Sequence, residues 1–313
     1  MQTPDSSDTC TQTFHDRHIH GIAGVDFATS SSDQIRAALA LLRDRRTTHV
    51  TASLPSLQVE DLWAALAQLQ RLHGQGLVAG VHLEGPFIAP EYAGAHPHEA
   101  LLKPDSVAGR DLLGQLLQLQ AETSLVTMMT VAPELPGFED LVQQLVAHGI
   151  TPALGHTGAT YDQMRAAITR IYELTEQPVM VTHLYNAMRG FHHRDPGPLL
   201  AVAEAAASGR VVVELIADGH HVDLKLIRWW FHHYPTAVRL VSDASAATVI
   251  AGQPPLTVGP PRLGDRVLHS AGPAGPRLAG QDTLASGGKD LLSIHDGLVA
   301  AGFAHDLVCG AMQ

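Results

Sequence analysis

Four polar residues that can bind a metal ion each follow a short apolar, strand-like run in this chain. They are Glu84, His156, His183 and Asp243. In an α/β barrel the carboxyl ends of the strands meet at one rim, so side chains that are distant in sequence converge there. Imidazole and carboxylate groups are ligands of divalent cations. The pattern therefore predicts a metal centre of the kind that hydrolytic enzymes use.

A fifth candidate is the histidine pair His18 and His20, which precedes these residues in the chain. Alternate side chains of an extended strand share one face, so both imidazoles could bind the same cation. Asp16 is close enough in sequence to orient one imidazole through a hydrogen bond. A purely structural histidine pair is the alternative. Most of the 20 histidines, His295 and His305 among them, lack partner motifs and are interpreted as surface or satisfied side chains.

Taken singly, each candidate ligand also has a structural explanation. Glu84 could form a buried salt bridge, and Asp243 could cap a helix that starts at Ala244. Under the metal hypothesis, Asp243 accepts a proton from the water that the metal activates and passes it to a leaving nitrogen. The two roles compete, because a capping carboxylate loses basicity. The combination of all the candidates favours the metal hypothesis.

Strand-like and helical runs alternate along the chain, which predicts parallel βαβ units. An α/β barrel takes about 250 residues, so the 313 residues suit a single catalytic barrel domain over 1–313. The expected strands cover 11–15, 50–54, 77–83, 125–131, 150–154, 179–182, 211–216 and 238–241, and the expected helices cover 33–46, 58–73, 106–120, 138–148, 161–174, 199–208 and 223–233. The first strand has almost no apolar residue and is inferred from the His18/His20 motif that follows it. The fold class is therefore α/β, a (β/α)8 TIM-like barrel of the metal-dependent hydrolase type.

Two segments depart from this alternation. Residues 1–13 are expected to be a disordered or irregular tail. Residues 251–280 are rich in proline and glycine, which forbids a long helix or a central strand. This second segment is either a floppy surface excursion or a loop that folds over the barrel rim beside Asp243. We adopt the excursion over the rim.

The composition argues against several functional classes. A net charge of −11 disfavours nucleic acid and anionic membrane surfaces as partners. Cys10 and Cys309 are the two cysteines, which do not make a disulfide framework. No apolar stretch approaches the roughly 20 residues of a membrane span, and the polar start lacks the features of a secretory signal. We expect a cytoplasmic protein.

A further group of residues could bind a phosphate or a similar anion. Asn186 and Ala187 follow His183 at a strand-to-loop junction, where backbone N–H groups can face an anion. Arg194 lies in the turn-forming sequence Arg194-Asp195-Pro196-Gly197, and His221 follows Asp218-Gly219-His220. Alone, each of these is a generic loop residue.

The motifs and their order resemble the N-acetylglucosamine-6-phosphate deacetylases of the amidohydrolase superfamily. The similarity runs from Asp16 to Gly280, most of the chain, and the ordered set is far more specific than any single short motif. The segments that carry it are His82-Leu83-Glu84-Gly85-Pro86-Phe87, Gly94-Ala95-His96, Val131-Ala132-Pro133-Glu134, Gly155-His156-Thr157, Thr182-His183-Leu184-Tyr185-Asn186-Ala187-Met188, Arg194-Asp195-Pro196-Gly197, Ile216-Ala217-Asp218-Gly219-His220-His221-Val222-Asp223 and Val241-Ser242-Asp243-Ala244.

The resemblance implies a function and a first set of site residues. The function is metal-dependent hydrolysis of the acetamide of N-acetylglucosamine 6-phosphate to glucosamine 6-phosphate and acetate, in amino-sugar catabolism. Glu84, His156 and His183 would hold the divalent metal ion, and Asp243 would be the general acid and base. Zinc, iron, manganese and cobalt all suit imidazole and carboxylate ligands.

A second set of roles also follows from the resemblance. His18 and His20 match the variant of the family that holds a second metal, so one or two ions per subunit are expected. His96 would contact the sugar or the amide carbonyl. The residues that would recognise the 6-phosphate are Asn186, Ala187 (through its backbone), Arg194 and His221. In this family some phosphate contacts cross a dimer interface, so a homodimer is expected.

The chain also departs from the family's pattern. Family members carry a small β-sandwich assembled from residues before and after the barrel, and here we expect that sandwich to be missing or vestigial. Gln281 stands where the family usually has a serine. Two other functions therefore stay open. One is a deacetylase or amidohydrolase acting on another N-acetyl sugar phosphate or a cyclic amide, and the other is a catalytically impaired, truncated paralogue that binds sugar phosphates.

Overall fold

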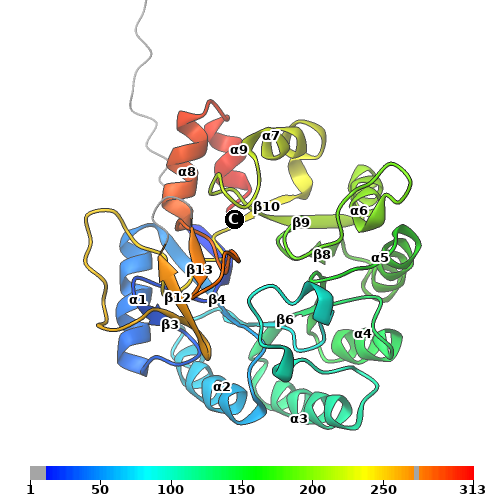
Figure 1. Cartoon of the computed structure of the whole chain (residues 1–313), viewed down its shortest axis with the longest axis horizontal. Helices are drawn as coiled ribbons and strands as arrows, with labels where there is room; N and C mark the ends of the chain where they lie inside the picture. Colours follow the sequence, from blue (N-terminus) through cyan, green and yellow to red (C-terminus); the bar gives the residue numbers. More distant parts are fainter. Residues whose placement is uncertain (1–11, 271–274) are drawn as a thin grey trace, which may run out of the picture.

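Eight parallel strands form the sheet that organises the molecule (Figure 1), in a computed structural model that describes residues 12–270 and 275–313. In sheet order the strands are β1 (Phe14–Ile19), β4 (Thr47–Leu54), β5 (Gly80–Glu84), β6 (Val126–Val131), β7 (Thr151–Leu154), β8 (Val179–Val181), β9 (Val211–Ile216) and β10 (Val238–Val241). The two outer strands meet as well, because the backbone N–H of Asp243 donates to the carbonyl of His18 at 2.8 Å. The sheet thus closes into a barrel.

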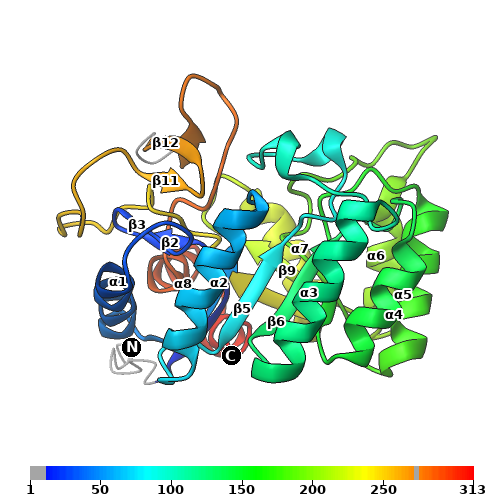
Figure 2. The ribbon, with the colours of Figure 1, turned by 90° about the horizontal axis from the view of Figure 1, so that it is seen from below.

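Helices surround this barrel (Figure 1), and several of them stand beside β5 and β6 in the view of Figure 2. They are α1 (Ser32–Asp44), α2 (Val59–His73), α3 (Val107–Thr123), α4 (Phe138–Ala147), α5 (Tyr161–Thr175), α6 (Gly197–Ala207), α7 (Leu224–His233), α8 (Leu291–Ala300) and α9 (His305–Gly310). The predicted (β/α)8 barrel is confirmed.

Helix α2 shows why these segments are helical. Its buried residues Leu62, Leu66 and Leu69 recur at helical spacing, so one face of α2 is apolar and covers the barrel. Helix α1 begins at a capping box, in which the Ser31 side chain accepts from the Gln34 N–H and the Gln34 side chain accepts from the Ser31 N–H. Apolar stripes and caps together fix where each helix starts and which face it buries.

The first strand lies later in the chain than the sequence predicted. The prediction of 11–15 is wrong, because β1 covers Phe14–Ile19 and contains His18 instead of preceding it. Asp16 and His18 are both 0 % exposed, so the strand buries polar side chains. Asp16 is held by the backbone N–H of Ser242 at 3.2 Å. A search for apolar runs misses this strand, because some of its buried residues are polar groups that belong to the candidate site.

A small sheet lies outside the barrel in the proline- and glycine-rich segment. Its strands are β11 (Arg262–Leu263), β12 (Arg266–Ser270) and β13 (Pro276–Leu278), paired antiparallel. Figure 2 shows β11 and β12 above one end of the barrel. Leu263, Leu268 and Leu278 form a second apolar cluster with Ala95 and Ala247 of the barrel loops.

The described residues hold one other sheet, the pair β2 (Gly21–Ile22) and β3 (Val25–Asp26). No larger sandwich of strands occurs within 12–270 and 275–313. Up to residue 11, the tail expected at 1–13 lies outside the described residues. In the part of the chain that the structure covers, no helix is both long enough and apolar enough to cross a membrane.

We expect Leu69→Ala to lower the free energy of unfolding by about 2–5 kcal/mol, because the side chain is 0 % exposed and its loss leaves a cavity. Leu226→Ala is the matched control, since Leu226 is 40 % exposed and its truncation should change stability by only about 0.5 kcal/mol. Chemical denaturation measures both. Equal effects of the two changes would contradict the packing described for α2.

Candidate active site

The carboxylate of Glu84, at the end of β5, is the centre of the candidate site. Its Oε1 lies 3.0 Å from Nε2 of His156 and 2.8 Å from Nε2 of His183, which follow β7 and β8. The two Nε2 atoms are 3.0 Å apart. Three groups from three strand ends therefore point at one place, and all three are at least 96 % buried.

A second group of ligand atoms lies beside the same carboxylate. His20 Nε2 is 3.1 Å from Oε2 of Glu84, and His18 Nε2 is 3.5 Å from Oε1. Both nitrogens are 3.3 Å from Oδ1 of Asp243, which follows β10. Glu84 therefore contacts two sets of donors, and its two oxygens could bind two cations.

The hydrogen bonds behind the imidazoles decide which nitrogen can bind a metal. Nδ1 of His156 lies 2.7 Å from the carbonyl of Tyr92, and Nδ1 of His18 lies 3.2 Å from Oε2 of Glu214. Both partners are acceptors, so each Nδ1 carries a proton and each Nε2 is the nitrogen that faces Glu84 and can bind a cation. A buried carboxylate among these nitrogens needs positive charge beside it, which a protonated imidazole or a bound cation supplies. These donors fit a divalent metal ion.

His96 has the opposite tautomer. The backbone N–H of Ser56 donates to Nδ1 of His96 at 2.9 Å, so the proton sits on Nε2. That Nε2 is 3.2 Å from Oε2 of Glu84. Burial lowers the pKa of His96 to about 4, so the ring is neutral at pH 7. His96 is thus a neutral hydrogen-bond donor beside the ligand cluster and does not offer Nε2 to a cation.

Opposite charges on the carboxylates and imidazoles of the cluster stabilise one another. Burial alone would raise the pKa of Glu84, but the positive charge of His18 and hydrogen bonds with His156 and His18 hold that pKa well below its usual range. Burial would likewise lower the pKa of His18, yet Asp243 and Glu84 raise it well above its usual value. Two buried carboxylates therefore stay anionic, and the site attracts positive charge.

Three of the site residues have left-handed backbone conformations. The φ angles are +47° for His156, +24° for His183 and +47° for Asp243. Such conformations cost about 1–3 kcal/mol for a residue other than glycine and persist only where the surroundings impose them. Each of these residues is the second one after a barrel strand, so the strained turn aims the side chain at the rim. Asp243 does not have the alternative role of a helix cap, because residues 244–250 form no helix.

A cavity of about 210 Å³ opens onto this cluster. Its wall includes the sequence-predicted residues Glu84, His96, His156, His183, Asn186, Ala187, His221 and Asp243, together with Leu263 of β11 and Thr283, Leu284 and Ala285. The volume suits a small molecule, and the wall combines charged groups at one end with apolar groups from the segment after β10.

His221 lines the cavity and is paired with a buried carboxylate that favours its cationic form. Its Nδ1 is 2.9 Å from Oδ2 of Asp218, which also accepts the backbone N–H of Gly288 at 3.0 Å. Burial acts to lower the pKa of His221, but the hydrogen bond and charge of Asp218 raise it above its usual value. The imidazolium can attract an anion.

Arg194 is the one predicted substrate-binding residue that the structure does not bring to the cavity. It is exposed and does not line the wall. Asn186 is half-buried and its side-chain N–H donates to the carbonyl of His183 at 3.0 Å.

Sequence reasoning missed two buried residues that support the site. Glu214 meets the imidazole of His18 from behind, a role that the sequence had suggested for Asp16. His82 hydrogen-bonds to Ser53 and Thr130, and its ring packs edge-on against His18 at 4.6 Å between centroids. The sequence did place Glu214 and His82 inside otherwise apolar strands. Such buried polar groups need partners, so their positions could have indicated a supporting role.

A (β/α)8 barrel whose strands end in a histidine and carboxylate cluster defines the class of metal-dependent hydrolases of the amidohydrolase superfamily. No family model matches the chain. An N-acetylglucosamine-6-phosphate deacetylase from Danio rerio is 34% identical over 268 residues, which are 82% of this chain and 63% of that protein. An N-acetylgalactosamine-6-phosphate deacetylase from Escherichia coli O157:H7 is 35% identical over 214 residues, which are 66% of this chain and 52% of that protein.

A solved structure of an N-acetyl-D-glucosamine-6-phosphate deacetylase mutant from Mycobacterium smegmatis, in complex with N-acetyl-D-glucosamine-6-phosphate, is similar with a TM-score of 0.81. Its sequence is 35% identical, and the match covers 96% of this chain and 74% of that one. The chain belongs to the N-acetylglucosamine-6-phosphate deacetylase family. It spans 63% of the length of the Danio rerio relative.

We expect Glu214→Gln to weaken metal binding by about 10–100-fold, because a neutral amide orients the His18 imidazole less strongly than a carboxylate does. Titration of metal-free protein with Zn²⁺ or Co²⁺ measures the change. Glu173→Gln, at an exposed position on α5, is the control and should bind as the unaltered protein does. Unchanged affinity in Glu214→Gln would show that the contact to His18 has no part in metal binding.

Proposed function

We propose that this chain hydrolyses the acetamide of N-acetylglucosamine 6-phosphate to glucosamine 6-phosphate and acetate, in amino-sugar catabolism. The observation that carries the proposal is the convergence of Glu84, His156, His183 and Asp243 on one cavity. Similarity to deacetylases of two amino-sugar phosphates supports it. The acidic chain suits a cytoplasmic enzyme with a small-molecule substrate and with no nucleic-acid or membrane partner.

Glu84, His156 and His183 would hold one divalent cation, and His18 and His20 would hold a second with Asp243. Zinc, iron, manganese and cobalt suit this set of nitrogen and oxygen donors. When bound, such a cation polarises a carbonyl and lowers the pKa of water to about 7.

Asp243 would act as the general base and then as the general acid. Burial acts to raise the pKa of Asp243, but the charge of His18 and a hydrogen bond from His20 hold it below its usual value. The carboxylate is therefore ionised and can accept a proton from the attacking water. As the carbon–nitrogen bond breaks, that proton passes to the departing amine nitrogen.

His96 would position and polarise the acetamide. Its protonated Nε2 faces the cluster, because the Ser56 N–H occupies Nδ1. A fixed donor at this place can hydrogen-bond to the carbonyl oxygen and stabilise the negative charge that develops there. The backbone holds the donor in place before substrate binds, so little reorganisation is needed during the reaction.

The phosphate would bind at the other end of the cavity, to Asn186, to the backbone N–H of Ala187 and to the cationic His221. Arg194 would complete this site from the partner subunit of a homodimer. Arg194 is exposed and does not line the cavity of its own subunit, as expected for a side chain that reaches the cavity of the partner.

A second candidate substrate is N-acetylgalactosamine 6-phosphate, favoured by the 35% identity to the Escherichia coli O157:H7 deacetylase of that sugar. The two sugars differ in the configuration of one hydroxyl, so the shape of the cavity wall decides between them. Acetate release from each substrate, at matched concentrations and with each of the four metals added to metal-free protein, separates the candidates. Release from neither sugar with any metal would refute both.

We expect Asp243→Asn to lose nearly all acetate release and to retain the metal at Glu84, His156 and His183. Removing the proton-transfer group should slow turnover by about 10²–10⁴-fold. Asp162→Asn, at a side chain that is 83% exposed, is the matched control and should leave the rate unchanged. Normal turnover by the Asp243 variant would rule out its role.

We expect Arg194→Ala to raise KM for a phosphorylated substrate by at least about tenfold. The reason is the loss of one charge-assisted hydrogen bond, which contributes about 1.4 kcal/mol or more to binding. An uncharged acetamide should show no change. Arg165→Ala, at a side chain that is 62% exposed, is the control.

Mixing the Arg194→Ala and Asp243→Asn proteins tests whether Arg194 acts across the interface. If Arg194 acts on the partner's site, a mixed dimer has one site with both native groups and one site with neither. When half of the dimers are mixed, activity should therefore recover toward about 25% of the unaltered rate. No recovery would place Arg194 outside the partner's site.

A further inference from the structure

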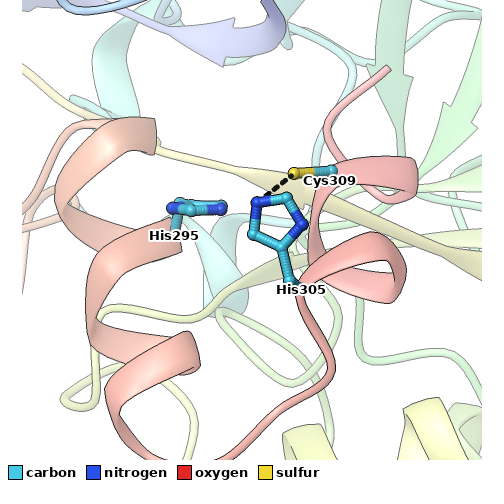
Figure 3. A group of neighbouring side chains, drawn as sticks. All are labelled: His295, His305 and Cys309. Carbon is cyan, nitrogen blue, oxygen red and sulfur yellow. Dashed lines mark hydrogen bonds between the residues drawn. The ribbon is translucent and has the colours of Figure 1, made fainter. Parts of the chain in front are cut away.

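A second group of metal-ligand side chains lies between the last two helices. His295 comes from α8, and His305 and Cys309 come from α9. His305 and Cys309 are four residues apart, so the helix places them on the same face. Figure 3 shows the His295 ring directed toward His305, and a dashed line joins the Cys309 sulfur to the His305 ring nitrogen. None of these residues lines the cavity that contains Glu84.

Each imidazole of this group is oriented by a neighbouring carboxylate. Nδ1 of His295 lies 2.9 Å from Oδ1 of Asp296, and Nδ1 of His305 lies 3.2 Å from Oδ1 of Asp306. A carboxylate only accepts, so Nδ1 carries the proton in both rings and both Nε2 atoms present lone pairs. Carboxylate–histidine pairs of this kind are typical behind the histidine ligands of metal ions.

The lone pair of His295 has no partner. The residue is 5 % exposed, and its Nε2 makes no hydrogen bond among the described residues. An unpaired buried acceptor is costly, by about 1–3 kcal/mol. The ligand atoms of His295, His305 and Cys309 all lie within 4.8 Å of one another, so the orphaned nitrogen faces two further ligand groups.

The spacing of the ligand atoms fits a tetrahedral zinc site. Zinc–nitrogen bonds of about 2.0–2.1 Å and a zinc–sulfur bond of about 2.3 Å set nitrogen and sulfur about 3.5 Å apart at tetrahedral angles. The observed distance from Cys309 Sγ to His305 Nε2 is 3.7 Å. The remaining pairs, which lie within 4.8 Å, need to approach by about 1.5 Å at most, within the reach of side-chain rotation.

We propose that His295, His305 and Cys309 form a second, separate binding site for a thiophilic divalent cation, and that this cation is Zn²⁺. Binding forms a zinc–sulfur bond and releases the Cys309 thiol proton to solvent, while both histidines bind through their neutral Nε2 atoms. Water fills the fourth position. It has access past His305, whose side chain is 30% exposed.

The site would stabilise the end of the barrel through α9. Directly after this helix, the carbonyls of Ala311 and Met312 accept backbone N–H groups of Leu240 in β10 and His15 in β1, each at 2.8 Å. A cation that joins α8 to α9 therefore fixes the segment that bridges the first and last barrel strands. Its role is structural, and it does not depend on the proposed deacetylase activity.

Cobalt spectroscopy distinguishes this site from the one at Glu84. Only a thiolate ligand gives an intense near-ultraviolet sulfur-to-cobalt charge-transfer absorption, and the Glu84 cluster contains no cysteine. The test uses the full chain carrying Cys10→Ser, so that Cys309 is its one remaining thiol. We expect Co²⁺ to produce the charge-transfer band, and Zn²⁺ to displace it and raise Tm.

The matched variant adds Cys309→Ser to the same protein. It should lose the band entirely and bind one metal equivalent fewer per chain, while the weaker visible absorption of cobalt in the Glu84 cluster persists. Asp306→Asn should keep the band but require about 10–100-fold more Co²⁺ to reach it. Circular dichroism checks that each variant is folded.

Two outcomes would overturn the proposal. One is the absence of a charge-transfer band from the Cys10→Ser protein at saturating Co²⁺. The other is a folded Cys309→Ser variant with the same metal content and the same Tm response to Zn²⁺ as its parent.

Discussion

The buried carboxylate of Glu84 sets the conditions that the rest of the site must meet. Five imidazole nitrogens, those of His18, His20, His96, His156 and His183, lie within 3.5 Å of its two oxygens. An ionised carboxylate in such a place is unstable unless positive charge stays beside it. The surrounding barrel therefore has to deliver several strand ends to one point and keep them there. Every unusual local feature nearby, from the left-handed turns to the buried Glu214, serves that requirement.

The barrel supplies this convergence because its strands are parallel and closed. Parallel strands bring every carboxyl end to the same rim, and closure through His18 and Asp243 joins the first strand to the last. The two residues that close the barrel through their backbone also place their side chains in the ligand cluster. The positions of these ligands therefore depend on the closure of the barrel. Loss of either one would disturb the other.

The sequence predicted the barrel and the places of Glu84, His156 and His183 because each follows an apolar run whose strand character is plain. It failed for β1, where the polar residues Asp16 and His18 are buried between Phe14 and Ile19 and interrupt the apolar pattern. Glu214 and His82 were missed because each stands singly within a strand, and only the fold reveals which groups they meet. His295 and His305 were set aside because their shared contact joins separate helices, and no spacing within one helix reveals it.

The small sheet β11–β13 and the barrel share the apolar cluster of Ala95, Ala247, Leu263, Leu268 and Leu278. Five side chains bury far less apolar area than the main core, so this flap has a lower opening free energy than the barrel beneath it. Leu263 also forms part of the cavity wall. Because Leu263 belongs to both the apolar cluster and the cavity wall, the same packing contact that anchors this small sheet to the barrel loops also sets the shape of the cavity.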